Sequence, residues 1–127
     1  MRPNRTALAI AATAALAAAA FAVAAEAASP TVHIDEKEWT VKRAAPAIKL
    51  VHGRTYTIAV HDTGKFTHDL LIDGHGLEDV GIHNKAPIHA GKSKSFSVKF
   101  PKAGTYDFYC AIPGHKAKGM ELKVVVS

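Results

Sequence analysis

Apolar and polar residues alternate along much of the chain after residue 30, and a period of two is typical of β-strands with one buried face. The clearest example is the segment 55–60, in which Tyr56, Ile58 and Val60 share one side of the predicted strand. Segments of this kind cover residues 31–34, 39–41, 47–51, 55–60, 66–73, 94–100, 105–110 and 120–126. About seven to eight short strands separated by turn residues predict an all-β protein, an antiparallel β-sandwich.

The strand predicted at residues 66–73 carries a histidine on its apolar side. Its alternation places His68 on the same side as Phe66, Leu70 and Ile72. We therefore expect one imidazole to point into the core of the sandwich.

Residues 74–91 interrupt the strand pattern. This segment holds four glycines, one proline and three histidines. It could be a long connection across the sandwich, or it could include a short helix around residues 77–80, and both alternatives stay open at this point.

The beginning of the chain differs in composition from the rest. Two arginines precede an alanine-rich apolar run over residues 7–25, and residues 25–27 fit a small-residue cleavage site. A run of about 19 apolar residues could instead be a membrane anchor, but alanine is only weakly apolar. We therefore expect residues 1–27 to be a secretory signal peptide and residues 28–127 to be one domain. The mature chain would not span the membrane and would lie in the periplasm, the cell envelope or the extracellular space.

The charge of the chain is mild and dispersed. The whole sequence has a formal charge of +5, which falls to +4 when residues 1–27 leave with two arginines and one glutamate. Basic runs interleaved with aromatic residues, which are typical of nucleic-acid binding, are missing. This charge supports at most a weak attraction to an acidic protein or an anionic surface. We expect no nucleic-acid partner and a monomeric protein.

Near the C-terminus, one short segment combines a thiol, an imidazole and a thioether. Cys110 is the only cysteine, so its thiol is buried and inert, paired with another chain, or a metal ligand. His115 and Met120 follow it at equal intervals, and Met120 is the only methionine apart from the initiator. A blue-copper site combines one thiolate and two imidazoles with a weak axial thioether. The segment therefore offers three of the four ligands of such a site.

The second imidazole must come from elsewhere in the chain. Six of the other histidines lie opposite apolar residues, beside turn glycines or in the irregular segment: His33, His52, His61, His75, His83 and His89. His68 alone points inward, so it is the strongest candidate. Taken singly, an inward histidine is often a hydrogen-bonded core residue, and a free cysteine is often a small buried hydrophobe. The combination of the four residues is what favours a metal site.

The segment 101–126 resembles the copper-binding end of the cupredoxins, the group of plastocyanin, azurin and auracyanin. The resemblance rests on Gly104-Thr-Tyr-Asp-Phe-Tyr-Cys110 followed by the spacing Cys-x4-His-x4-Met, and it is weaker over residues 47–72. It implies a Greek-key sandwich that binds one mononuclear type 1 copper and shuttles single electrons. The implied ligands are three equatorial residues, His68, Cys110 and His115, and one axial residue, Met120.

One residue departs from the pattern of this family. Many relatives carry asparagine after the first histidine ligand, where this chain has Asp69. A carboxylate can still accept hydrogen bonds from the amides of the neighbouring loop. Its charge would stabilise Cu(II) and so lower the reduction potential.

The function we expect is that of an exported one-electron carrier. His115 would be the electron port, surrounded by a rim of apolar residues, and Lys116 and Lys118 beside it would favour an acidic redox partner. A copper carrier or buffer that delivers metal to an acceptor would use the same ligands and is the alternative. Zinc could occupy the site where copper is scarce.

An enzymatic function is disfavoured. Cys110 could in principle act as a nucleophile with His115 as its base. However, Cys110 ends an inward-facing strand, no oxyanion-stabilising group is evident, and Met120 would have no role. A dinuclear copper centre would need two cysteines in the loop. We therefore expect a protein that is not an enzyme.

Overall fold

The computed structural model describes residues 27–127. All of the predicted signal peptide except Ala27 therefore lies outside the described residues. Within them, no helix is long and apolar enough to cross a membrane.

The described residues form eight strands and one short 3-10 helix. In chain order these are β1 (Thr31–Lys37), β2 (Thr40–Arg43), β3 (Thr55–Asp62), β4 (Leu70–Gly74), β5 (Leu77–Ile82), β6 (Ser93–Lys99), β7 (Gly104–Tyr109), η1 (Lys116–Lys118) and β8 (Glu121–Val126).

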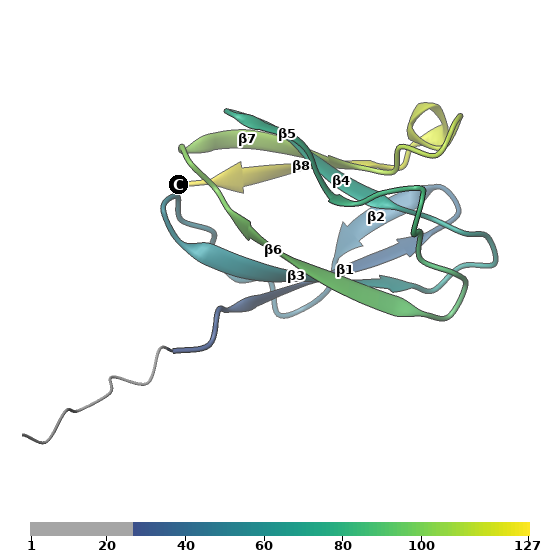
Figure 1. The fold of residues 1–127 in the computed structure, drawn as a ribbon, viewed down its shortest axis with the longest axis horizontal. Coiled ribbons are helices and arrows are strands. Elements are labelled where there is room, and N and C mark those ends of the chain that lie inside the picture. Colours follow the sequence, from purple (N-terminus) through teal and green to yellow (C-terminus); the bar gives the residue numbers. More distant parts are fainter. Residues whose placement is uncertain (1–26) are drawn as a thin grey trace, which may run out of the picture.

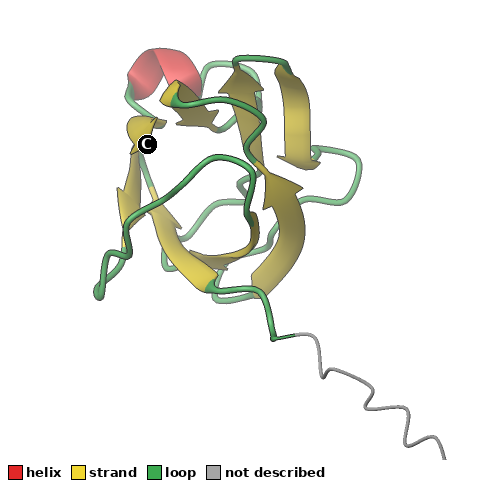
Figure 2. Cartoon of the chain, turned by 90° about the vertical axis from the view of Figure 1, so that its left-hand side faces the viewer, coloured by secondary structure: helices red, strands yellow, loops and turns green. Residues whose placement is uncertain are grey.

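The strands form two four-stranded sheets that face each other as a sandwich (Figure 1). One sheet has the order β2-β1-β3-β6 and the other β5-β4-β7-β8. Figure 2, turned by 90°, shows the same strands joined by loops that cross between the two layers. The expectation of an all-β sandwich is thus confirmed. One strand pair departs from a purely antiparallel arrangement, because β1 and β3 run parallel, with Thr31 opposite Thr57.

The core lies between the two sheets and follows the predicted alternation. Tyr56, Ile58 and Val60 of β3 are buried, as are Tyr106 and Phe108 of β7. Burial of apolar side chains is the main stabilising contribution, at roughly 25 cal/mol per Å² removed from water.

One residue of the predicted inward face of residues 66–73 lies elsewhere. His68, Leu70 and Ile72 are fully buried, as expected, but Phe66 is 57% exposed. The reason is that β4 begins only at Leu70, so the residues before it follow a loop and not a pleated strand. His68 is nevertheless fixed by a two-residue bridge to Ile88.

Two further expectations about strands are wrong. Residues 47–51 do not form a strand, and only Leu50 bridges to Val126. In the irregular segment, the short helix around residues 77–80 is not present, because Leu77–Ile82 forms β5, and residues 83–92 then cross from one sheet to the other. The glycines there have other roles: Gly74 and Gly76 take positive φ angles at the turn, and a Cβ on Gly81 would lie 2.2 Å from the Leu70 carbonyl oxygen.

Four connections gather at one end of the sandwich. They are the β1–β2 turn and the loops β3–β4, β5–β6 and β7–β8, and the last of these contains η1 (Figure 1). The described chain begins at the opposite end. All four predicted copper ligands belong to the end with the four connections, which we call the loop end.

Adjacent valines of β8 offer a matched test of the core. Val124 is 2% exposed and Val125 is 69% exposed. We expect Val124→Ala to lower the free energy of unfolding by about 2 kcal/mol, because it removes two buried methyl groups and leaves a cavity. Val125→Ala should cost less than about 1 kcal/mol. Urea unfolding of the metal-free proteins measures both values, and equal losses would contradict the assigned faces of β8.

Candidate metal centre

Three nitrogen and sulfur donors converge at the loop end of the core. The Nδ1 atoms of His68 and His115 are 3.2 Å apart, and Cys110 Sγ lies 3.5 Å from His115 Nδ1. The three donor atoms all lie within 4.8 Å of one another. His68 and Cys110 are fully buried, and His115 is partly exposed. The structure therefore brings together the three residues that the sequence pointed to as equatorial ligands.

Met120 is held beside these residues by the backbone. The Cys110 amide donates to the Met120 carbonyl oxygen at 3.1 Å, and the Met120 amide donates to the His115 carbonyl oxygen at 3.2 Å. The Met120 side chain is fully buried. The loop closes through η1 and Gly119, whose φ of 117° is one that glycine readily adopts.

Burial changes the protonation of two of the donors. It raises the pKa of the Cys110 thiol to about 12, so the metal-free site holds a neutral thiol. Burial, with His68 as a smaller contribution, lowers the pKa of His115, which favours the neutral imidazole that a metal needs. A metal ion that binds here must therefore displace the thiol proton.

The donor set fits copper better than other common metals. A thiol, two imidazoles and a nearby thioether are soft and borderline ligands, which suit copper cycling between Cu(II) and Cu(I). Closed structural zinc sites use four strong ligands, commonly with more thiolates. The residues present thus match the metal that the sequence predicted.

Comparison with known proteins agrees with this chemistry. The family of copper-binding proteins described as the plastocyanin/azurin family matches residues 31–127. The chain belongs to this family. The buried cluster at the loop end is accordingly a type 1 copper site, and the fold is that of a cupredoxin.

One curated relative and several solved structures resemble this cupredoxin. It is 33% identical to rusticyanin of Acidithiobacillus ferrooxidans over 93 residues, which cover 64% of this chain and 60% of rusticyanin. The chain thus spans 60% of the length of that relative. The fold is also similar to auracyanin from Roseiflexus castenholzii, with a TM-score of 0.62 and 22% identity over 79% of this chain and 98% of auracyanin. Auracyanin A from Chloroflexus aurantiacus has a TM-score of 0.60 and 19% identity, with 79% of this chain and 100% of auracyanin A covered.

Asp69 ties the two ligand-bearing segments together. Its Oδ1 accepts a hydrogen bond from the Ala111 amide at 2.6 Å, and its own amide points to Cys110 Sγ at 3.5 Å. The other carboxylate oxygen, Oδ2, is buried without a hydrogen-bond partner. The Asp69 carboxylate therefore accepts the hydrogen bond from the neighbouring loop that the sequence led us to expect. Its negative charge lies close to the sulfur of Cys110.

Two more carboxyl groups are buried at the same end of the core. Glu36 and Asp62 are 0% exposed, and three of their oxygens have no hydrogen-bond partner. Burial, together with the charges of Asp69 and Asp62, raises the pKa of Glu36 to about 9. Glu36 is thus neutral at physiological pH, which reduces the cost of holding three carboxyl groups together.

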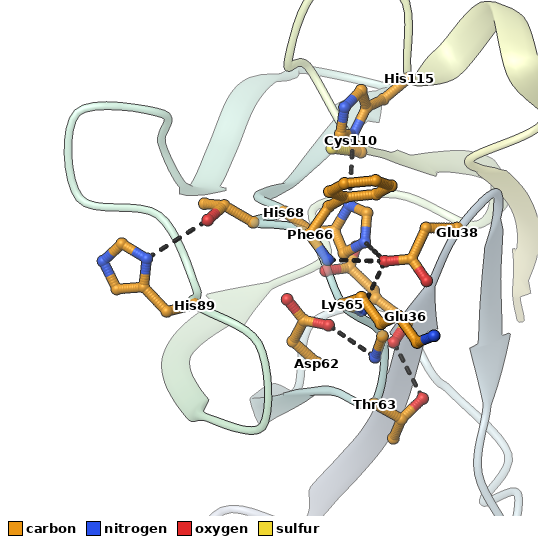
Figure 3. Close-up of polar contacts among 12 residues, drawn as sticks. Glu36, Glu38, Asp62, Thr63, Lys65, Phe66, His68, His89, Cys110 and His115 are labelled. Carbon is orange, nitrogen blue, oxygen red and sulfur yellow. Dashed lines mark hydrogen bonds and ion pairs between the residues drawn. The ribbon is translucent and has the colours of Figure 1, made fainter.

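Sequence reasoning missed two residues of this end, Glu38 and Trp39. The Glu38 carboxylate lies 3.3 Å from His68 Nε2, and the Trp39 ring packs against the His115 ring (Figure 3 shows the Glu38 contact). Hydrogen bonds from the backbone amides of Phe66, first, and Lys65 lower the pKa of Glu38 to about 2. Neither residue lies in a sequence motif. The only available signal was their position in the turn that connects β1 and β2.

Replacing Asp69 by asparagine tests the effect of its charge on the copper. Asp69→Asn keeps an oxygen for the Ala111 amide but removes the negative charge near Cys110. We expect a higher reduction potential. The shift is on the order of 60 mV for each tenfold decrease in the ratio of Cu(II) affinity to Cu(I) affinity. Voltammetry of the two copper-loaded proteins measures the shift. An unchanged or lower potential would show that this charge does not act on the metal.

Replacing Glu36 by glutamine tests the buried acid. The folded pKa of about 9 exceeds the ordinary value of 4.5, so the stability that the neutral group contributes is lost as pH rises from about 4.5 to about 9. Glutamine cannot ionise. Relative to wild type, the free energy of unfolding of Glu36→Gln should rise by up to about 1.4 kcal/mol per pH unit across this range. Urea unfolding of metal-free protein from pH 5 to pH 9 measures this, and parallel pH profiles would contradict it.

Proposed function

We propose that this chain is an exported type 1 copper protein that carries one electron at a time between redox partners. The proposed equatorial ligands are His68 Nδ1, Cys110 Sγ and His115 Nδ1, and the proposed axial ligand is Met120. The observation that carries the proposal is the convergence of the three donor atoms within 4.8 Å in a buried place. Bound copper would supply the Cu(II)/Cu(I) couple.

The protein supports such a couple by keeping the ligands in place. Cys110 follows β7 and His68 precedes β4, and these two strands are hydrogen-bonded neighbours in one sheet. His115 and Met120 are held to each other and to Cys110 by backbone hydrogen bonds. Ligands anchored in this way move little when the charge of the metal changes, which favours fast electron exchange.

The surface beside the site favours docking of a protein partner. A hollow of about 530 Å³ lies next to Cys110 and is lined mainly by apolar loop residues, including Ala111, Ile112, Pro113 and Ala117. His115 is partly exposed in the same loop. These residues are the apolar rim expected from the sequence, and His115 in the same loop is the proposed electron port.

The lysines beside this rim differ in their ability to attract an acidic partner. Lys116 Nζ already lies 2.6 Å from Asp107 and 3.9 Å from Glu121. Lys118 Nζ lies 4.0 Å from the centre of the Trp39 ring. A cation over an aromatic face keeps its charge, so Lys118 is the better candidate for attraction to an acidic partner.

Export and a monomeric state are parts of the proposal that rest on the sequence. Residues 1–27 have the pattern of a signal peptide, and the lone cysteine belongs to the copper site. The described chain begins at the end of the sandwich opposite the site (Figure 1). The loop end would meet a redox partner in the periplasm, the cell envelope or the extracellular space.

The burial of the ligands favours electron transfer over metal delivery and over enzymatic catalysis. His68 and Cys110 are fully buried, so an acceptor protein could not reach them without opening the core. The same burial raises the pKa of the thiol to about 12, which opposes a role as a nucleophile.

The experiment compares the rate of electron exchange with the rate of copper transfer in the copper-loaded protein. We expect a reversible one-electron couple in voltammetry, and slow transfer of Cu(I) to a soluble chelator compared with electron exchange. A copper carrier would show the reverse: fast transfer of copper and no reversible couple. That result would overturn the proposed function.

A further inference from the structure

The turn between β1 and β2 reaches the loop end and contacts both histidines of the copper site. Glu38 and Trp39 are the two residues between these strands. Glu38 faces His68, and Trp39 faces His115. One two-residue turn thus lies against two ligands that are 47 residues apart in the chain.

Glu38 links His68 to the loop that precedes it. Its Oε1 accepts hydrogen bonds from the amides of Lys65 at 2.7 Å and Phe66 at 2.8 Å, and it lies 3.3 Å from His68 Nε2 (Figure 3). An ionised carboxylate only accepts hydrogen bonds, so His68 Nε2 must carry the proton in this contact. In the neutral imidazole the other ring nitrogen, Nδ1, then keeps its lone pair, and this atom faces His115.

Trp39 packs against the second histidine. The centres of the Trp39 and His115 rings are 5.1 Å apart and their planes meet at 88°. The Phe66 ring, 6.3 Å away, and Lys118 Nζ, 4.0 Å away, also lie against Trp39. His115 belongs to a short loop, so its ring orientation depends on neighbours of this kind.

The turn fits closely between the two ligand loops. A Cβ on Gly64 would lie 2.4 Å from Glu38 Oε1, and a Cβ on Gly119 would lie 3.0 Å from the Trp39 carbonyl oxygen. Glycine at these two places lets both loops approach the turn. The contacts of Glu38 and Trp39 are therefore part of the packing at the loop end.

We propose that Glu38 and Trp39 are positioning residues that hold the two histidines in their metal-binding orientation before copper arrives. Glu38 selects the tautomer of His68 that presents Nδ1, and Trp39 fixes the ring of His115. The proposal rests on the ligand roles proposed above. Groups that orient a metal-binding histidine typically contribute about 10–100-fold to metal affinity.

The first test follows His68 in the metal-free protein. Ring ¹⁵N chemical shifts distinguish the two imidazole tautomers, and we expect the Nε2–H form in the wild type and in Glu38→Gln, whose amide oxygen can still accept. In Glu38→Ala we expect a mixture of tautomers. A tautomer that is the same in wild type and Glu38→Ala would overturn the role of Glu38.

The second test measures Cu(I) affinity by competition with a chelator. Trp39 is the only tryptophan, so its fluorescence reports the site in every variant that keeps it. We expect Glu38→Ala to bind Cu(I) about 10–100-fold more weakly, Glu38→Gln to recover most of the loss, and the exposed Glu78→Ala to match the wild type. If Glu38→Ala does not fold, Glu38→Asp replaces it, because the shorter side chain should also lose the contact. Affinity within twofold of wild type in the folded variant would overturn the proposal.

Trp39→Leu, assayed by absorbance of the chelator, tests the second contact. We expect weaker Cu(I) binding and broadened His115 ring signals in the metal-free protein. Val51→Ala is the control, because it shortens an exposed apolar side chain that has no contact with Trp39, and its affinity should stay within twofold of wild type. Equal effects of the two substitutions would overturn the role of Trp39.

A wild-type protein that binds copper without a reversible couple would refute the proposed function and leave these comparisons valid.

Discussion

The structure depends on one requirement, which is to hold two imidazole nitrogens and a sulfur close together and away from water. Burying such groups is costly unless they find partners, so the backbone around them must be firmly placed. The pairing of β4 with β7 provides this, because its register sets Leu71 opposite Tyr109 and so brings His68 and Cys110 to the same edge. The hydrogen bond from Ala111 to Asp69 extends this pairing beyond the last strand residue.

The charges at the loop end favour a bound cation. Glu36, Asp62 and Asp69 are all fully buried there; Glu36 is neutral, and Asp69 lies next to the sulfur of Cys110. Burial, first, and the charge of Asp69 oppose a free thiolate, which is why the thiol is held in its protonated form. A copper ion would bring positive charge to the place where Asp69 and the sulfur meet. The charge of Asp69 should favour Cu(II) over Cu(I).

Local patterns predicted much of the fold and of the site. Alternation with a period of two identified the inward faces of β3 and β7 and singled out His68, because burial on one face of a strand is a local property of the sequence. The same rule failed for Phe66, which lies in a loop. It also missed β5, because glycines interrupt the pattern there: Gly74 and Gly76 are required by the turn, and Gly81 by the close approach of β5 to β4. Glu38 could not be found in this way, since its contact with His68 depends on how one turn packs against a distant loop.

The most direct test of the account is the visible absorption spectrum of the protein after loading with one equivalent of Cu(II). A type 1 site predicts an intense charge-transfer band from the Cys110 thiolate to copper, which disappears on reduction and is absent from the Cys110→Ser variant. A wild-type protein that binds Cu(II) without such a band would contradict the account, as would a band that survives the loss of the thiol.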